Sequence, residues 1–192
     1  MERSLRELHT DRIDVLLIHR PDWLTSAEET ARGLQAVQAI AQAPGVARLA
    51  FGSLDFMLDL DVPADSLMLD MAAAQIALAS RAAGLPAPVA GVTPALDAAQ
   101  VSADMAQARS LGFGAKMCIH PGQVAAVLTA LAPTAAELAW AQRVLQQVEQ
   151  HGLGAIAVDG KLVDRPVWLL AQSLVNEAQQ SAALPAGEKV TP

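Results

Sequence analysis

Polar side chains that could do chemistry follow short apolar runs at several points of the chain. Ser53 and Asp55 come just after the run at 47–51, and His120 comes just after the run at 115–119. In parallel α/β proteins, residues at such positions form the functional face. A carboxylate there can hold Mg²⁺, which prefers oxygen ligands and keeps several waters. A lone Asp more often caps the following helix, so the residues by themselves are weak evidence for a metal at Asp55.

The composition excludes several other kinds of site. The chain has no Tyr, so a tyrosine general acid is absent, and its one cysteine, Cys118, excludes an internal disulfide and fits a reducing compartment. Because Cys118 lies in an apolar run, we expect a buried thiol. The formal net charge of −7 argues against a nucleic-acid surface. We find no signal peptide and no apolar span, and therefore expect a cytoplasmic protein that binds neither nucleic acid nor membrane.

The elements that must position these side chains alternate between strands and helices. Runs typical of buried parallel strands occupy residues 13–19, 47–51, 88–92 and 115–119. Helical patterns occupy residues 27–43, 65–83, 97–110, 123 onward, 134 onward and 167–181. Residues 152–166 are expected to form a loop or hairpin that turns at Asp159-Gly160. This alternation predicts a parallel α/β architecture.

The number of strands limits the choice of architecture. A closed (β/α)8 barrel needs eight strands and typically about 250 residues. The chain shows four strand-like runs in 192 residues. The residues alone leave a half-barrel and an open sheet as alternatives. We expect residues 1–192 to form a single domain, because this length is enough for one sizeable core.

Four short sequence motifs occur in the same order as in a known family. They are ARLAFGSLDFMLDL (47–60), RAAGLPAPVAGVTPALD (81–97), SLGFGAKMCIHPGQV (110–124) and VDGKLVDRPVW (158–168). With these motifs, residues from about 29 to 170 resemble the C-terminal half of a citrate lyase beta-subunit-like CoA-ester lyase of the HpcH/HpaI aldolase superfamily. The resemblance implies a TIM-barrel-type fold, present here as a half or incomplete barrel with C-terminal helices over 29–181, followed by a flexible tail at 182–192.

The resemblance also implies an activity. It is a Mg²⁺-dependent carbon–carbon lyase that cleaves the CoA thioester of a hydroxy acid, of citryl-CoA or malyl-CoA type, with a CoA thioester or small keto acid as its partner. The metal would stabilise the developing enolate oxygen. Glu29 and Asp55 match the family's two metal-binding acids. Asp164 matches an acid near the active site, often of a neighbouring subunit, so we expect it to assist proton transfer or hydrolysis in a homo-oligomer. Lys116 and His120 match positions that shape the strand end and its loop.

Other observations support a second hypothesis. Ser26 and Glu29 have capping-box spacing, so Glu29 could instead cap a helix. Ala90 stands where the family usually has an acid, and the strand that carries the family's substrate-binding Arg is missing. The alternative is therefore a catalytically inactive chimeric or truncated half-barrel, which acts only as an oligomeric structural fragment and covers its open sheet edges in that way.

The N-terminal segment resembles another family. Residues 2–29 look like an aldo-keto reductase segment, with a helix, a strand ending in His19 and then Arg-Pro-Asp. We place this segment at 1–28 and the join between the two resemblances near 27–34. The reductase acid is a Tyr, which this chain lacks, so we do not expect reductase activity.

Overall fold

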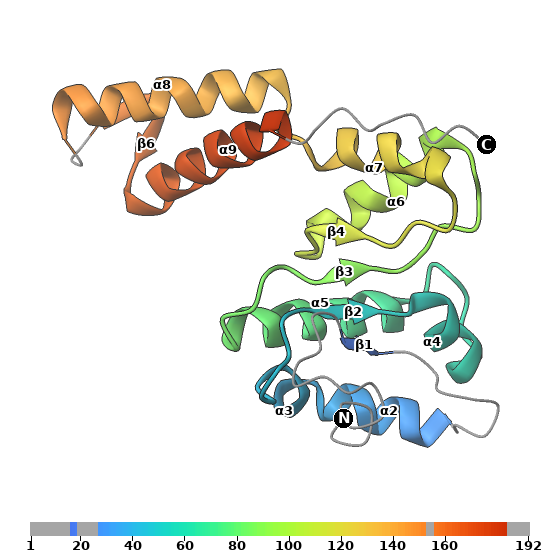
Figure 1. Cartoon of the computed structure of the whole chain (residues 1–192). Helices are drawn as coiled ribbons and strands as arrows, with labels where there is room; N and C mark the ends of the chain where they lie inside the picture. Colours follow the sequence, from blue (N-terminus) through green and yellow to red (C-terminus); the bar gives the residue numbers. More distant parts are fainter. Residues whose placement is uncertain (1–15, 19–26, 153–155, 184–192) are drawn as a thin grey trace. The chain divides into compact units, whose positions relative to one another are not determined.

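Figure 1 shows the chain as a computed structural model, which describes residues 16–18, 27–152 and 156–183. The chain divides into two compact units, residues 1–131 and residues 132–192. This division falls inside the segment 29–181 that the sequence analysis treats as lyase-like. Most of the segment that resembles an aldo-keto reductase, with its His19, lies outside the described residues.

A parallel sheet with the strand order β1-β2-β3-β4 forms the centre of the first unit. Its strands are β1 (Leu16–Ile18), β2 (Leu49–Phe51), β3 (Val89–Ala90) and β4 (Ala115–Lys116). Each lies within a run predicted to be a strand, which confirms the α/β class. All three residues of β2 are buried, as expected for an inner strand of a parallel sheet. Among the described residues, β1 and β4 are the edge strands.

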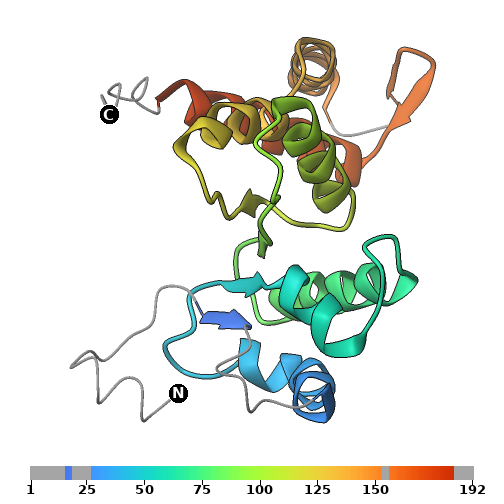
Figure 2. The same cartoon turned by 90° about the vertical axis from the view of Figure 1, so that its right-hand side faces the viewer.

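Helices connect these strands. They are α2 (Ala27–Gln35), α3 (Val37–Ala41), α4 (Ser53–Leu60), α5 (Leu67–Ala82), α6 (Ala98–Ser110) and α7 (Val124–Leu131), with the short 3₁₀ helix η1 (Pro121–Gln123) before α7. Side-chain oxygens of Ser66 and Asp97 cap α5 and α6. Figures 1 and 2 show α5 beside β2 on one face of the sheet, where the two elements are in contact.

The main core of the first unit joins β2 to the helices around it. Leu49 and Phe51 of β2 pack with buried residues that include Val37 of α3 and Ile76 of α5. The rings of Phe51 and Phe56 meet edge to face, with centroids 5.3 Å apart. Because Phe56 belongs to α4, this aromatic pair holds α4 against the strand that leads into it. The sequence analysis did not predict α4.

Two helices and a hairpin form the second unit. They are α8 (Ala135–His151), β5 (Ile156–Val158), β6 (Lys161–Val163) and α9 (Arg165–Ala183). The antiparallel β5–β6 hairpin turns at Asp159 and Gly160, whose φ angles are 51° and 75°, which confirms the predicted turn. A capping box of Thr134 and Glu137 begins α8 at the predicted place.

One stretch of the described chain, residues 121–151, is long and apolar enough by composition to cross a membrane. The structure divides this stretch at Pro133, where α7 has ended and the Thr134 cap begins α8. The two helices have 8 and 17 residues. A membrane-spanning helix needs about 20 consecutive apolar residues. Neither helix reaches that length.

Candidate functional site

Asp55 lies at the carboxyl edge of the sheet, by which we mean the side where the parallel strands end. It belongs to the first turn of α4, which begins directly after β2 and Gly52. Its side chain is half-buried. The first turn of a helix favours a carboxylate because unpaired backbone N–H groups and the helix dipole are positive there. The local fold therefore places a carboxyl group at this edge of the sheet.

Glu29 lies on α2, in the third position of that helix. Helix α2 contacts α4, which carries Asp55. Figure 1 shows the first turns of both helices at the same end of the sheet. The side chain of Glu29 is outside the described part of the structure. The shared metal site of Glu29 and Asp55 therefore stays a prediction.

The donor set at this edge can be compared with what a divalent cation requires. Among the described side chains, no group of three or more His, Cys, Asp or Glu residues could hold a metal ion together. Mg²⁺ is usually held by one or two carboxylates and keeps several waters. A site based on Asp55 and one further acid therefore fits Mg²⁺.

The loop that follows β3 packs tightly against the start of α4. A Cβ atom on Gly91 would collide with the Ser53 hydroxyl and would lie 2.9 Å from the Phe51 carbonyl oxygen. Only glycine fits at this position without a shift of the backbone. Ala90, which replaces the acid usual in the family, is buried at 6% exposure. The edge thus has an apolar methyl group at this position, beside the residues that lead to Asp55.

Lys116, the last residue of β4, reaches across to the same loop. Its Nζ donates a hydrogen bond to the Gly91 carbonyl oxygen at 2.8 Å. Burial lowers the pKa of Lys116, and the nearby charges of Asp104 and Cys118 partly oppose this shift. The contact agrees with the prediction that Lys116 shapes the strand end.

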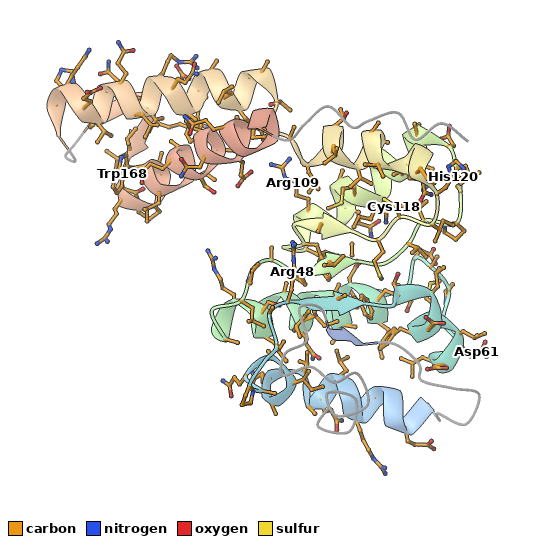
Figure 3. All side chains as sticks on the ribbon, viewed as in Figure 1. Arg48, Asp61, Arg109, Cys118, His120 and Trp168 are labelled. Carbon is orange, nitrogen blue, oxygen red and sulfur yellow. The ribbon has the colours of Figure 1, made fainter. Side chains whose placement is uncertain are left out.

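His120 and Cys118 follow β4 on an exposed stretch (Figure 3). His120 Nδ1 accepts a hydrogen bond from the Gly122 N–H at 3.0 Å and so caps η1. This contact agrees with the predicted loop-shaping role. The prediction that Cys118 is buried is wrong. The strand ends at Lys116, so the apolar run continues as an exposed segment instead of an inner strand.

A hollow of about 520 Å³ lies between α5, α6 and the loop after β3. Its polar lining includes Ser53, Thr93, Asp104 and Lys116, and most of the remaining wall is apolar. This size is within the range of small-molecule sites, about 300–1,000 Å³. Asp55 is not part of the lining. The hollow therefore adjoins the start of α4 without including the carboxylate that we assign to the metal.

Asp164 belongs to the second unit and lies just before α9. Its Oδ1 accepts a hydrogen bond from the Val167 N–H at 3.1 Å, and its side chain is exposed. This contact is a helix cap, which explains the residue without any catalytic role. The predicted role of Asp164 in proton transfer at a neighbouring subunit's site stays a prediction.

The sequence analysis gives no role to one further residue at the carboxyl edge. Gln123 follows β4 and is 2% exposed. Its side chain makes three hydrogen bonds, which join the loops after β3 and β4. Its partners Thr93 and Ala95 lie about 30 residues away, so neither periodicity nor spacing indicates this contact.

Comparison with known proteins adds to this geometry. Residues 23–121 match the model of the HpcH/HpaI aldolase/citrate lyase family. A citrate lyase subunit beta-like protein of Deinococcus radiodurans is 35% identical over 153 residues, which are 77% of this chain and 54% of the relative. A (3S)-malyl-CoA thioesterase of Cereibacter sphaeroides is 30% identical, over 93% of this chain and 64% of the relative. The chain thus spans between half and two thirds of these curated relatives.

Solved structures agree in fold. A crystal structure of the protein CitE from Mycobacterium tuberculosis, in complex with magnesium, acetoacetate and coenzyme A, superposes with a TM-score of 0.73 at 26% identity. The superposition covers 93% of this chain and 73% of the CitE chain. A citrate lyase from Burkholderia xenovorans gives the same TM-score over 94% of this chain. The family model covers just over half of the residues, so the chain belongs to the HpcH/HpaI aldolase/citrate lyase family.

Proposed function

We propose that this chain is a Mg²⁺-dependent lyase that cleaves a carbon–carbon bond in the CoA thioester of a hydroxy acid, of the citryl-CoA or malyl-CoA type. The observation that carries the proposal is the position of Asp55 in the first turn after an inner strand. Relatives named (3S)-malyl-CoA thioesterase and citramalyl-CoA lyase support this substrate class. The CitE complex with magnesium, acetoacetate and coenzyme A supports the cofactor and a keto-acid fragment.

In this proposal each of the candidate residues has a separate role. Asp55, with Glu29, would hold the ion at the carboxyl edge, and the bound ion would stabilise negative charge that develops on the enolate oxygen. Ala90 contributes a buried methyl group beside this edge. Asp164 of another copy would move a proton or assist hydrolysis, so we also propose a homo-oligomer. We propose a cytoplasmic location on the evidence of the single cysteine.

A second candidate function follows from the exposed ends of the sheet. In the described residues, β1 and β4 have no outer neighbour, and the chain covers 54% of the Deinococcus relative. A half-barrel with these free edges could act only as a structural fragment that is stabilised by assembly.

Titration with Mg²⁺ tests the proposed site. A ligand that binds only the folded state raises its stability, so millimolar Mg²⁺ should raise the melting temperature of the wild-type chain. Asp55→Asn should abolish this rise. Asp61→Asn is the matched control, because Asp61 ends the same helix, is exposed and has a φ of 51°, which asparagine tolerates. Equal responses of the two variants would contradict the assignment of Asp55.

Turnover tests the activity separately. The wild-type chain, incubated with citryl-CoA or malyl-CoA and Mg²⁺, should release a shorter acyl-CoA and a keto acid, and EDTA should stop the release. A chain that binds Mg²⁺ but yields no product from either thioester would favour the structural fragment.

A further inference from the structure

The side-chain amide of Gln123 connects two loops at the carboxyl edge. Its Nε2 donates hydrogen bonds to the carbonyl oxygens of Thr93 at 2.9 Å and Ala95 at 2.8 Å. Its Oε1 accepts a hydrogen bond from the Ile119 N–H at 3.0 Å. Both amide hydrogens and the amide oxygen are therefore used. With 2% exposure, water has little access to replace these bonds.

Only an amide of this length provides this set of bonds. Two carbonyl oxygens require two donors, and a backbone N–H requires an acceptor. A glutamate at 123 would keep the acceptor but would face the carbonyls without a donor when ionised. A methionine would keep the length and lose all three bonds, which leaves buried carbonyl groups unsatisfied. Both substitutions thus test the bonds while they keep the approximate shape of the side chain.

Two other side chains hold the same loop from different elements. Lys116 of β4 donates to the carbonyl of Gly91, the first residue of the loop. The Thr93 hydroxyl donates to Asp104 of α6 at 2.5 Å. Together with Gln123 they fix the loop at its start and in its middle. A loop that is held by several side chains at once is typical of segments whose position matters for a functional site.

The fixed loop in turn limits the position of α4. Gly91 is so close to Ser53 and the Phe51 carbonyl that a Cβ would not fit. Ser53 is the first residue of α4, two residues before Asp55. We propose that Gln123 is a positioning residue, which holds the loop between β3 and α6 against the start of α4 and so sets where the Asp55 carboxylate meets a metal ion. The inference has two halves. The structural half, that Gln123 holds the loop, stands without any metal, whereas the metal half, that this position sets the Mg²⁺ affinity, rests on the proposed function.

Hydrogen exchange of the metal-free full chain tests the structural half. In Gln123→Met and Gln123→Glu, the Met117 and Ile119 amides, which bond to Ala90 and Gln123 where the two loops are joined, should exchange at least about tenfold faster than in the wild type, because the loops lose their link. Gln75→Met is the control, since Gln75 is an exposed glutamine in the middle of α5. Unchanged exchange of the Met117 and Ile119 amides in both Gln123 variants would overturn the inference. If the methionine variant does not fold, the glutamate variant decides.

Mg²⁺ affinity tests the metal half. The dissociation constant for Mg²⁺ should rise about tenfold in the Gln123 variants, as is usual when a residue that orients metal ligands is changed. Calorimetry at a temperature where every variant is folded measures it. Val144→Ala controls for general instability, because Val144 of α8 is buried in the separate core of the second unit and its truncation should leave the Mg²⁺ affinity unchanged. Faster exchange with unchanged affinity would refute the link to Asp55. A wild-type chain without Mg²⁺ binding would refute the proposed function, and the exchange result would then decide the structural half alone.

Discussion

The two units differ in the length of chain that their polar side-chain contacts span, which is 25 to 30 residues at the carboxyl edge of the first unit and 16 residues between Arg143 and Asp159 in the second. In the first unit, polar side chains join segments far apart in sequence: Gln123 bonds to Thr93 and Lys116 to Gly91. In the second unit the polar contacts of the helix starts are local, as in the capping box that begins α8 and the cap by Asp164. Local contacts form wherever the helix forms, whereas distant contacts require the whole unit. The difference shows why the candidate metal edge depends on residues far from it.

The largest expected effect is at the close approach of Gly91. Gly91→Ala should destabilise the first unit by about 3 kcal/mol, because the added methyl group meets the Phe51 carbonyl and the Ser53 side chain. Urea unfolding with exchange detection in each unit measures this effect. In contrast, Gly33→Ala should stabilise α2 by roughly 0.5–1 kcal/mol, since nothing lies within 4 Å of its added Cβ. A neutral Gly91→Ala would break the contrast between the units.

A substitution in the core of the second unit should destabilise that unit more than the first. Val144 of α8 is fully buried among residues of β5, β6 and α9. Val144→Ala should cost about 2 kcal/mol and should speed exchange in α8 and α9. Exchange in β2 and α5 should change less. Equal acceleration in both sets of elements would contradict the local character of the second unit.

Loss of the capping box should have a smaller effect. Thr134→Ala removes the acceptor for the Glu137 N–H and should cost about 1 kcal/mol, visible as a lower melting temperature. Thr129→Ala serves as a control, because Thr129 bonds back to the Ala125 carbonyl within α7 and caps nothing. That variant should change the melting temperature much less. Equal losses would show that the box does not stabilise the start of α8.

The smallest expected effect is a pH dependence from Lys116. Burial lowers its pKa below the ordinary value of 10.5, so the folded state disfavours the protonated form. The unfolded state then binds more protons between the lowered pKa and 10.5, and stability should rise with pH across that window. The urea midpoint of the wild type, followed from pH 7 upward, should therefore rise relative to the midpoint of Lys116→Met, which lacks the titrating amine. A wild-type profile parallel to that of the variant would exclude this contribution.

The sequence allowed much of this structure to be predicted, for reasons that are local. The apolar run at 47–51 and the turn at Asp159-Gly160 are set by neighbouring residues, so their patterns are visible in one dimension. The helix α4 was missed because Leu54, Phe56, Leu58 and Leu60 recur at every second residue, a spacing that does not indicate a helix. The exposure of Cys118 was mispredicted because the length of β4 depends on pairing with β3, which no pattern within the run reports.

The residues of the candidate site also differ in whether the sequence could reveal their roles. Asp55 could be found from its place after a strand and from the family motif that contains it. The role of Gln123 could not be found, because it arises from a contact with Thr93 across about 30 residues. The cap that Asp164 forms at the start of α9 is a local contact that the sequence analysis did not predict.

The exposure of Cys118 has a practical consequence. It is the only thiol in the chain and lies on the segment after β4, three residues before η1. A maleimide dye will therefore attach at one defined position near the carboxyl edge, without any engineered residue. Its fluorescence can report in real time whether magnesium or an acyl-CoA changes the surroundings of that segment.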